Sequence, residues 1–360
     1  MSAETIETSE PAASEQTADA PAATTGPTTE RLPMARAINA GLRRAMATDD
    51  RVMLMGEDIG RLGGVFRVTD GLQAEFGTQR VVDSPLAESG ILGTAIGLAM
   101  AGYRPVVEIQ FDGFVFPAFD QITTQLAKLH YRSAGRLQVP VVIRIPYGGN
   151  IGAIEHHSES PEALFAHTAG LRIVTPATAA DAFTMIQQSI ASPDPVIFLE
   201  PKARYWDKGE VDLSGSGVDL GPDGWRSLHV ARTVRTGSDL TIAAYGPTVA
   251  TALAAAQVAE GEGHDVEVVD LRSVSPIDVD TLAESVGRTG RLVVVHEAPM
   301  FFGPGAEIAA RVTERCFHQL EAPVLRVGGF HTPYPASAIE KEYLPSLDRI
   351  LDAVDRSLAY

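Results

Sequence analysis

The sequence of 360 residues has a single cysteine, no long apolar run and few basic residues. Cys316 on its own excludes an intrachain disulfide and any thiolate metal cluster, which fits a reducing cytoplasm. The most apolar stretch, residues 90–102, is shorter than the roughly 18 residues that a membrane span needs. With 29 Lys and Arg against 46 Asp and Glu, the formal net charge is −17, which argues against nucleic-acid binding because phosphates are bound by clustered Lys and Arg. We therefore expect a cytoplasmic protein with neither a membrane nor a nucleic-acid partner.

The beginning of the chain also lacks what a folded segment needs. Residues 1–30 are rich in Ala, Thr, Ser, Glu and Pro, contain no Lys or Arg, and have no apolar centre. Such a segment cannot bury enough apolar surface to fold. A secretory signal would need a basic start and an apolar centre, and a transit peptide would be rich in Arg and poor in acids. We predict that residues 1–33 form a disordered tail.

From residue 34 onward, short apolar segments alternate with segments of helical length and periodicity. Helices are predicted at residues 34–47, 90–100, 119–131 and 179–191, and strands at residues 52–55, 105–111, 140–145, 171–174 and 195–199. Strands that alternate with helices in this way form a parallel sheet covered by helices on both faces. Residues 34–205 are therefore predicted to form a first α/β domain.

A second alternation follows a break rich in Gly, Asp, Ser and Pro, where we place a linker at residues 206–230. Strands are then predicted at residues 240–245, 265–270, 291–296 and 324–327, and helices at residues 248–260, 278–288 and 306–317. Residues 231–360 are predicted to form a second, smaller domain. The predicted fold class is α/β, with two three-layer α/β domains.

Parallel α/β sheets often bind nucleotides, but the usual nucleotide motifs are absent from this sequence. No P-loop string occurs, and Gly90, Gly93 and Gly97 lack the Rossmann spacing. Their i, i+3, i+7 positions on a predicted helix favour close packing against another helix. The sequence therefore does not favour a free-standing nicotinamide enzyme.

Glu88 stands where a predicted strand at residues 80–83 passes through a turn into a helix. Open parallel sheets bind ligands at the carboxyl ends of their strands, so Glu88 is a candidate functional residue. A carboxylate at a helix N-terminus also stabilises the helix dipole. These two interpretations of Glu88 are equally compatible with the motif alone.

His156 and His157 lie in a polar segment that follows the Gly-rich residues 147–152. A third metal ligand at usable spacing is missing, so the pair favours proton transfer over metal binding. A solvated polar loop is the alternative. We assign two further segments, residues 296–299 and 330–335, to architecture or subunit contact.

Ten strings occur in a fixed order between Met34 and the C-terminus. They are Gly56-Glu-Asp58, Gly63-Gly-Val-Phe-Arg67, Ser84-Pro-Leu-Ala-Glu88, Glu108-Ile-Gln-Phe111, Phe116-Pro-Ala-Phe-Asp-Gln121, His156-His-Ser-Glu-Ser-Pro-Glu162, Glu200-Pro-Lys202, Asp270-Leu-Arg272, Thr289-Gly-Arg291 and His296-Glu-Ala-Pro299. In this combination they resemble the β subunits of 2-oxo acid dehydrogenases, and several forms look more like the branched-chain members. The resemblance implies a thiamine-diphosphate pyrimidine-binding domain followed by a transketolase C-terminal-like domain.

The resemblance also implies roles for particular residues. Glu88 matches the catalytic glutamate that hydrogen-bonds N1′ of the cofactor's aminopyrimidine. His157 matches the catalytic histidine that helps to protonate and orient groups during transfer to the lipoyl arm. Leu86 and Gln110 match cofactor-pocket positions, and Phe114 stands where an aromatic ring faces the pyrimidine, although branched-chain relatives often have Tyr there.

A possible potassium site is implied at Ser189, Ser192 and Asp194, which are the counterparts of residues that ligate a monovalent cation in relatives. The side chains differ here, so main-chain carbonyls would be the ligands. His331 is another departure, because relatives tend to have Asp before Thr-Pro.

A motif that the sequence lacks implies the partners. Relatives anchor Mg²⁺ and the diphosphate through a Gly-Asp-Gly…Asn segment, and no such segment occurs here. The resemblance therefore implies a shared cofactor site, with Mg²⁺ held by a separate α subunit in an α2β2 heterotetramer.

The implied function is the decarboxylation of a branched-chain 2-oxo acid and the reductive acylation of the lipoyl group on an acyltransferase core (E2). Two alternatives remain open. One is the β subunit of a pyruvate or acetoin dehydrogenase, and the other is a non-catalytic scaffold that keeps the fold.

Overall fold

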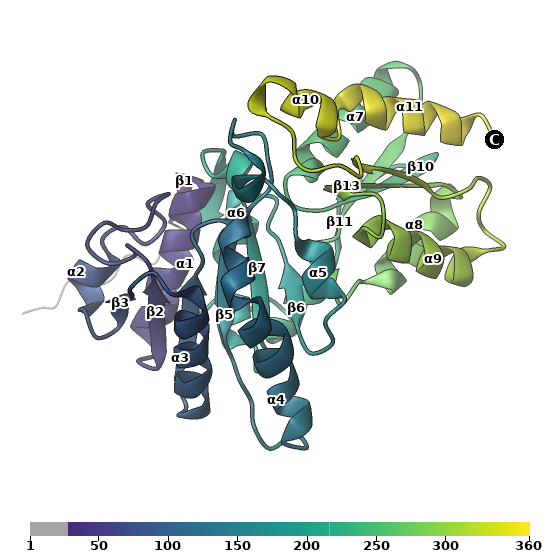
Figure 1. Cartoon of the computed structure of the whole chain (residues 1–360). Helices are drawn as coiled ribbons and strands as arrows, with labels where there is room; N and C mark the ends of the chain where they lie inside the picture. Colours follow the sequence, from purple (N-terminus) through teal and green to yellow (C-terminus); the bar gives the residue numbers. More distant parts are fainter. Residues whose placement is uncertain (1–27, 216) are drawn as a thin grey trace, which may run out of the picture.

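The computed structural model describes residues 28–215 and 217–360, so most of the predicted tail lies outside the described residues. Two largely parallel sheets stand side by side, each covered by helices on both faces (Figure 1). The first sheet has seven strands in the order β12-β6-β7-β5-β4-β2-β3, and the second has five in the order β14-β13-β10-β11-β9. The predicted α/β class with two three-layer units is confirmed.

The first sheet is parallel except at its β12 edge. Its strands are β2 (Val52–Gly56), β3 (Val81–Asp83), β4 (Arg104–Glu108), β5 (Val142–Tyr147), β6 (Arg172–Val174), β7 (Val196–Pro201) and β12 (Ser273–Ser275). Strands β5 and β7 are buried at every position. Their continuous runs of apolar residues suit a sheet that is covered on both faces.

Helices α1 (Met34–Thr48) and α6 (Ala179–Ala191) cover one face of the first sheet. The other face is covered by α3 (Glu88–Met100), η1 (Asp112–Ala118), the π-helical η2 (Gln121–Leu126) and α4 (Ala127–Arg132). The predicted single helix at residues 119–131 is thus a succession of π-helical and α-helical turns. Four short elements complete this part of the chain: α2 (Leu72–Phe76), η3 (Glu155–His157), α5 (Glu162–Ala166) and η4 (Lys202–Arg204).

The second sheet is parallel except at its β9 edge. Its strands are β9 (Arg232–Arg235), β10 (Leu240–Ala244), β11 (Val266–Asp270), β13 (Leu292–Pro299) and β14 (Leu325–Gly329). Helices α7 (Thr248–Gly261) and α11 (Leu347–Leu358) cover one face, and α8 (Val279–Thr289) and α9 (Pro304–Cys316) cover the other. The short elements η6 (Ser337–Ile339) and α10 (Glu340–Tyr343) lie between β14 and α11, and η5 (Gly224–His229) precedes β9 and packs against α6 of the first domain.

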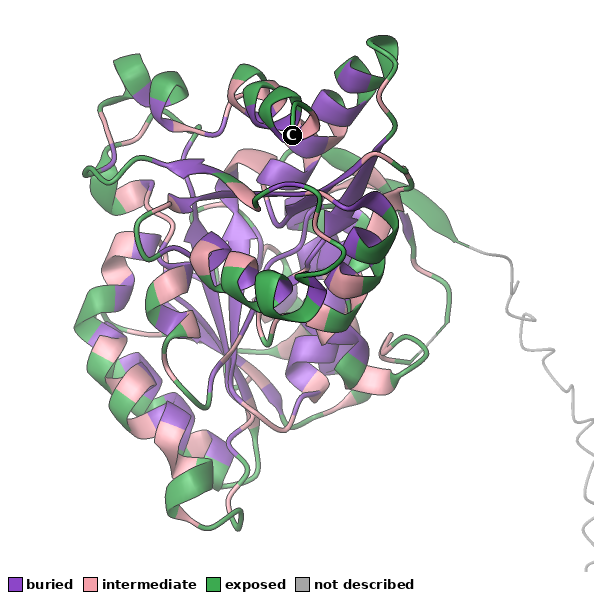
Figure 2. Cartoon of the chain, turned by 90° about the vertical axis from the view of Figure 1, so that its right-hand side faces the viewer, coloured by how far each residue is buried: buried purple, intermediate pink, exposed green. Residues whose placement is uncertain are grey.

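One apolar cluster joins the two domains. It runs from the α3 side of the first sheet to the α8 and α9 side of the second, whereas the outer faces of the two sheets have separate clusters. The central strands of both sheets are buried and the outward surfaces of the helices are exposed (Figure 2). Because the shared cluster spans both sheets, the two domains pack as one body.

Four strands, β1 (Thr29–Pro33), β8 (Lys208–Asp212), β9 and β12, lie where none was predicted, and the first two of them pair with each other. Residues 29–33, assigned to the tail, form β1, which pairs antiparallel with β8 inside the predicted linker. Both segments are polar, and each finds its partner far away in the sequence, so neither carries a local strand signal. The domain boundaries themselves stay a prediction.

The glycines of α3 do not pack as predicted. A Cβ added at Gly93 or Gly97 would meet no atom within 4 Å, and one at Gly90 would touch only Ala87. This face of the helix is therefore exposed, and the close helix packing expected from the spacing does not occur among the described residues.

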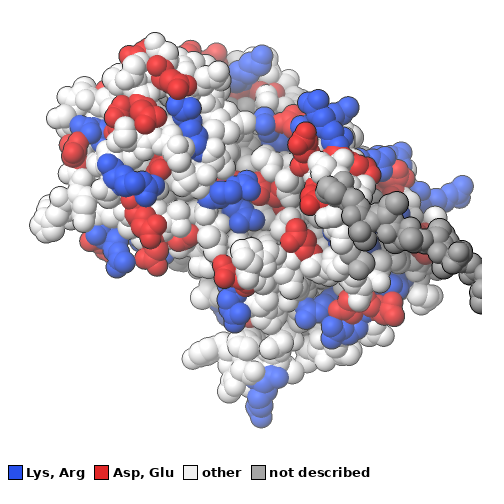
Figure 3. All heavy atoms as spheres, turned by 180° about the vertical axis from the view of Figure 1, so that it is seen from behind, with Lys and Arg blue, Asp and Glu red and all other residues white. Residues whose placement is uncertain are grey.

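The surface carries both basic and acidic side chains. On the face shown in Figure 3, Lys and Arg are interspersed with Asp and Glu. Of the helices in the described part of the chain, none combines the length and apolar character that crossing a membrane requires.

Candidate active site

The candidate residues gather where strands of the first sheet end. Glu57 directly follows β2, Glu88 begins α3 after β3, and Gln110 follows β4. These three strands are neighbours and run parallel, so their carboxyl ends lie along one edge of the sheet. That edge is where open parallel sheets hold ligands.

Two buried carboxyl groups lie together at this edge. Glu88 is 8% exposed and Glu57 is 9% exposed. Burial raises the pKa of Glu57, and the nearby Glu88 carboxylate raises it further. Glu57 Oε1 has no hydrogen-bond partner among the described residues, while Gln110 donates to the Glu57 main-chain carbonyl at 3.4 Å. A buried carboxyl oxygen without a partner is a place for a donor from a ligand.

Glu57 is a site residue that was not predicted from the sequence. The string Gly56-Glu-Asp58 directly after a buried strand was available as a signal. What the sequence could not show is that β2 and β3 are neighbours, and this pairing brings Glu57 beside Glu88.

His157 lies against an aromatic wall. Its ring stacks on Phe111 at a centroid distance of 4.1 Å and meets the edge of Phe114 at 5.2 Å. Its Nδ1 lies 2.8 Å from the main-chain carbonyl of His156. Because a carbonyl can only accept, Nδ1 carries the proton in this contact, and Nε2 is left as the nitrogen that exchanges a proton in the neutral ring.

A buried ion pair supports the segment that carries His157. Lys202 Nζ donates to Asp112, and the other oxygen of Asp112 accepts from the main-chain NH of Glu159 at 2.9 Å. Burial raises the pKa of Asp112 and lowers that of Lys202, and the contact between the two groups opposes both shifts. The pair thus joins η1 and the start of η4, directly after β7, to the histidine segment.

A second buried network lies in the sheet beneath the site. Arg144 on β5 donates to Glu108 on β4 at 2.6 Å and to Glu200 on β7 at 2.6 and 3.0 Å. The hydroxyl of Tyr205 donates to Glu200 at 2.5 Å. These contacts fix the ends of three neighbouring strands relative to one another, which preorganises the residues that follow them.

Leu86 differs from the other predicted cofactor residues. Gln110, Phe114, Glu88 and His157 belong to one series of neighbouring groups along the sheet edge, but Leu86 is 82% exposed at the rim. A large apolar side chain so exposed contributes to a pocket only when another surface covers it.

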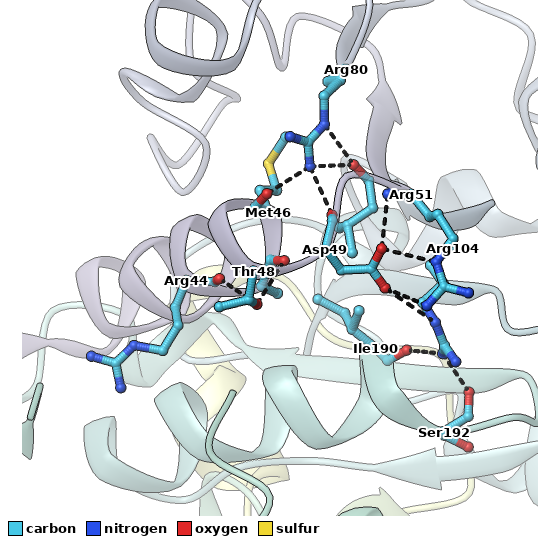
Figure 4. A network of polar contacts seen from close by, with 11 residues as sticks. Arg44, Met46, Thr48, Asp49, Arg51, Arg80, Arg104, Ile190 and Ser192 are labelled. Atoms are coloured by element: carbon cyan, nitrogen blue, oxygen red, sulfur yellow. Dashed lines mark hydrogen bonds and ion pairs between the residues drawn. The ribbon is translucent and has the colours of Figure 1, made fainter. Parts of the chain in front are cut away.

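The segment predicted to bind a monovalent cation, residues 189–194, contacts the positively charged side chain of Arg104 (Figure 4). Arg104 donates to the carbonyl of Ile190 at 2.6 Å and to that of Ser192 at 3.4 Å, and its Nε lies 3.7 Å from the Asp49 carboxylate. Of the predicted ligands, Ser189 donates its hydroxyl to the helix, to the Met185 carbonyl. A guanidinium on these carbonyls competes with a monovalent ion for the same oxygens.

Asp194, the third predicted cation ligand, also has a protein partner. Its carboxylate accepts from Arg172 Nε at 2.9 Å, and its main-chain carbonyl accepts from the Ser192 hydroxyl at 3.2 Å. Within residues 28–215 and 217–360, no group of three His, Cys, Asp or Glu side chains is placed to hold a metal ion. The potassium site stays a prediction.

Comparisons with known proteins agree with this fold. The family model "Transketolase, pyrimidine binding domain" matches residues 30–207, and "Transketolase, C-terminal domain" matches residues 229–350. A solved structure described as "Split gene transketolase, inactive beta4 tetramer" aligns over 91% of this chain and 98% of its own with a TM-score of 0.71. At 23% identity it shows the fold alone. These matches define the class as a two-domain protein of the transketolase type.

Relatives narrow that class. The chain is 61% identical to the pyruvate dehydrogenase E1 component subunit beta of Leifsonia xyli subsp. xyli, over 93% of this chain and 97% of the relative. It is 52% identical to the 3-methyl-2-oxobutanoate dehydrogenase subunit beta of Mycobacterium tuberculosis, over 92% and 93%, and 44% identical to the 2-oxoisovalerate dehydrogenase subunit beta of Pseudomonas aeruginosa, over 91% and 95%. The chain belongs to the family of 2-oxo acid dehydrogenase E1 β subunits, which are components of oxidoreductases.

Proposed function

We propose that this chain supplies half of a thiamine-diphosphate site and works with an α subunit in an α2β2 enzyme that decarboxylates a 2-oxo acid. The observation that carries the proposal is the pair of buried carboxyls, Glu88 and Glu57, at the carboxyl edge of the first sheet. The unpaired Glu57 oxygen and the aromatic wall of Phe111 and Phe114 suit a flat ring that offers nitrogen atoms. Bound thiamine diphosphate would supply the carbanion chemistry of the reaction.

Glu88 is the group that would face the cofactor's pyrimidine ring. Its burial places the carboxyl in surroundings poor in water, where a hydrogen bond to a ring nitrogen is strengthened. Burial and the neighbouring Glu88 carboxylate raise the pKa of Glu57, which favours a proton on Glu57 beside the ring. Gln110 would help to position this pair through the Glu57 carbonyl.

His157 would hold and move a proton at Nε2 during transfer of the acyl group to the lipoyl arm. Its contact with the His156 carbonyl fixes the Nδ1 proton, and stacking on Phe111 fixes the plane of the ring. Fixed orientation of this kind is what general acid and base catalysis requires.

The α subunit would complete the site. The chain has no Gly-Asp-Gly…Asn string, so Mg²⁺ and the diphosphate would be held by the partner. The exposed Leu86 at the rim is a surface for that partner to cover. The acyl group would pass to the lipoyl domain of an E2 acyltransferase core. The single cysteine suits the reducing cytoplasm, where we place the enzyme.

The favoured substrate is a branched-chain 2-oxo acid, as the sequence strings suggested. Pyruvate is the second candidate, and it is supported by the 61% identity to a relative named for pyruvate. The α2β2 enzyme, reconstituted with its α subunit, should be assayed on 3-methyl-2-oxobutanoate and on pyruvate at equal concentrations. The larger kcat/KM identifies the substrate, since specificity is a ratio of these constants.

The shared site is tested by calorimetry. Thiamine diphosphate with Mg²⁺ should bind tightly to the reconstituted pair and not measurably to this chain alone. Tight, Mg²⁺-dependent binding by the isolated chain would show that it holds the diphosphate itself, and the shared-site proposal would fail.

A further inference from the structure

The second domain forms hydrogen bonds with the segment that carries His157. We call residues 148–160 the histidine loop. Its base is closed by a hydrogen bond from Gly148 N to the Glu159 carbonyl at 3.0 Å. On one side the loop contacts the first domain, where a Cβ added at Gly113 would lie 2.3 Å from the His156 carbonyl oxygen. On the other side it contacts three residues of the second domain.

Those three residues, Glu297, Tyr334 and Glu340, form what we call the latch. Glu297 lies near the end of β13, Tyr334 follows β14, and Glu340 begins α10. Each is less than a tenth exposed. They come from separate segments of the second domain, yet the hydroxyl of Tyr334 donates to Glu340 at 2.9 Å, so two of them act as a unit.

Main-chain NH groups of the histidine loop converge on the latch. Gly149 N donates to Glu297, Asn150 N donates to the Tyr334 hydroxyl at 3.2 Å, and Gly152 N donates to Glu340 at 3.2 Å. At the far end of the loop, the hydroxyl of Ser160 reaches the same Glu297 oxygen at 3.4 Å.

The loop backbone is shaped for these contacts. Gly148, Asn150 and Gly152 have φ values of 82°, 62° and 72°, in the left-handed region that few residues other than glycine adopt. This backbone conformation points the NH groups of the loop toward the second domain. Gly149 is required for a different reason. A Cβ there would lie 1.8 Å from the Tyr334 hydroxyl oxygen, so only glycine allows the loop to come this close.

We propose that the second domain sets the position of the catalytic histidine, with Glu297, Tyr334 and Glu340 as positioning residues for His157. The loop is short and closed at its base, so a shift at Gly149 to Gly152 is transmitted to the ring a few residues on. The first domain holds the far end of the loop, through Asp112 to Glu159, Gly113 against His156 and the stacking of His157 on Phe111, whereas residues 149–152 are held by the second domain. This inference rests on the proposed role of His157.

The alternative is that these contacts only fasten the two domains together. Domain packing has its own basis in the shared apolar cluster, which does not include the latch. A purely adhesive role would change stability without changing how the loop moves or which catalytic step is slow.

Tyr334→Phe is the sharpest test, in the full chain reconstituted with its α subunit. The ring remains to pack on Tyr343 at 5.1 Å, and only the hydroxyl that accepts from Asn150 and donates to Glu340 is lost. Tyr343→Phe is the matched control, because in the described part of the chain no hydrogen bond joins the Tyr343 hydroxyl to the loop.

Two rates should be measured for each variant: decarboxylation with an artificial electron acceptor, and acyl transfer to a lipoyl domain. We expect Tyr334→Phe to slow acyl transfer about tenfold to hundredfold, as misplacement of a catalytic group does. Decarboxylation and the Kd for thiamine diphosphate should stay within about twofold. Hydrogen exchange of the amides in residues 148–160 should become faster in Tyr334→Phe and stay unchanged in Tyr343→Phe.

A second pair of variants distinguishes loss of positioning from a general loss of folding. Glu340→Ala removes the acceptor for Gly152 N, whereas Glu340→Gln keeps an oxygen that can accept it. We expect Gln to preserve most of the acyl-transfer rate that Ala loses. Equal losses for Ala and Gln, or equal behaviour of Tyr334→Phe and Tyr343→Phe, would overturn the positioning role.

His157→Ala separates this inference from the proposed function. If His157→Ala leaves acyl transfer unchanged, the proposed role of His157 is wrong and the latch has no catalytic group to position. If His157→Ala slows transfer and Tyr334→Phe does not, the proposed function stands and the latch is only structural.

Discussion

Buried carboxyl groups stand near the carboxyl ends of strands in both sheets, but the surroundings of Glu57 and Glu297 differ. At the first sheet, Glu57 keeps an oxygen without a partner beside the buried Glu88. At the second sheet, one oxygen of Glu297 accepts from Gly149 and Ser160. Similar architecture thus produces two uses of a buried acid. An oxygen left unpaired is available to a ligand, whereas one that is paired with a neighbouring segment holds that segment in place.

The largest expected effect tests the first of these uses. Glu88→Gln keeps the shape of the side chain but removes its ability to hold and release a proton. We expect kcat of the reconstituted enzyme to fall about 10²- to 10⁴-fold, the range for loss of a general acid or base. The measurement is steady-state decarboxylation, with urea unfolding as the control. Unchanged activity would mean that Glu88 only stabilises the start of α3, the structural alternative.

The next effect concerns the ion pair that supports the histidine loop from the first domain. Lys202→Met would leave Asp112 buried without its counter-charge. Breaking a buried pair from one side costs about 3–5 kcal/mol, and urea unfolding should show a loss of that size. Adding Asp112→Asn should recover part of the loss, because the remaining buried group is then neutral. No recovery would show that packing of the lysine stem, not charge, is what matters.

A smaller effect follows from the acids between the domains. Burial raises the pKa of Glu162 to about 7, and its Oε1 accepts from the Tyr245 hydroxyl at 2.8 Å. In the unfolded chain the pKa of this group is near its ordinary value of 4.5. A raised pKa means that the stabilising contribution is complete below about pH 4.5 and is lost as pH rises through about 7. Glu297 and Asp270, whose pKa values burial also raises to about 7, act in the same direction.

Glu162→Gln should therefore flatten the decrease in stability between pH 5 and pH 8 by about 1–3 kcal/mol, at about 1.4 kcal/mol for each unit of pKa difference. Urea unfolding at several pH values gives this slope. The pH-independent cost of burying an amide does not affect it. Glu314→Gln, at an exposed position on α9, is the control and should leave the slope unchanged. Parallel profiles for Glu162→Gln and the parent chain would contradict the raised pKa.

Particular residues show how far the sequence alone could lead. The periodicity at residues 34–47 predicted α1 nearly to its ends, because an apolar stripe at helical spacing is a local signal. β1 and β8 were missed because their pairing is not local. In the site, Glu88 and His157 were found through strings of specific residues. Glu57 and the latch were not, because they reach their partners only through strand order and domain packing.

Arg104 illustrates a different limit. The sequence pointed to a cation at residues 189–194, but it gave no sign that an arginine from the start of β4 reaches the same carbonyls. The backbone of α6 and its following turn supplies oxygens that suit a positive charge in either case. A side chain from a neighbouring strand can occupy such a place, and contacts of this kind follow from strand order.

The smallest expected effect concerns an exposed ion pair, for comparison with the buried pair of Lys202 and Asp112. Arg315 on α9 pairs with Asp280 on α8 at 3.3 Å, and both side chains are mostly exposed. Exposed pairs contribute about 0–1 kcal/mol because water and salt screen them. Arg315→Ala should thus change the free energy of unfolding by about 0.5 kcal/mol or less, measured beside Lys202→Met under the same conditions. A loss as large as that of Lys202→Met would mean that burial does not decide the strength of ion pairs in this protein.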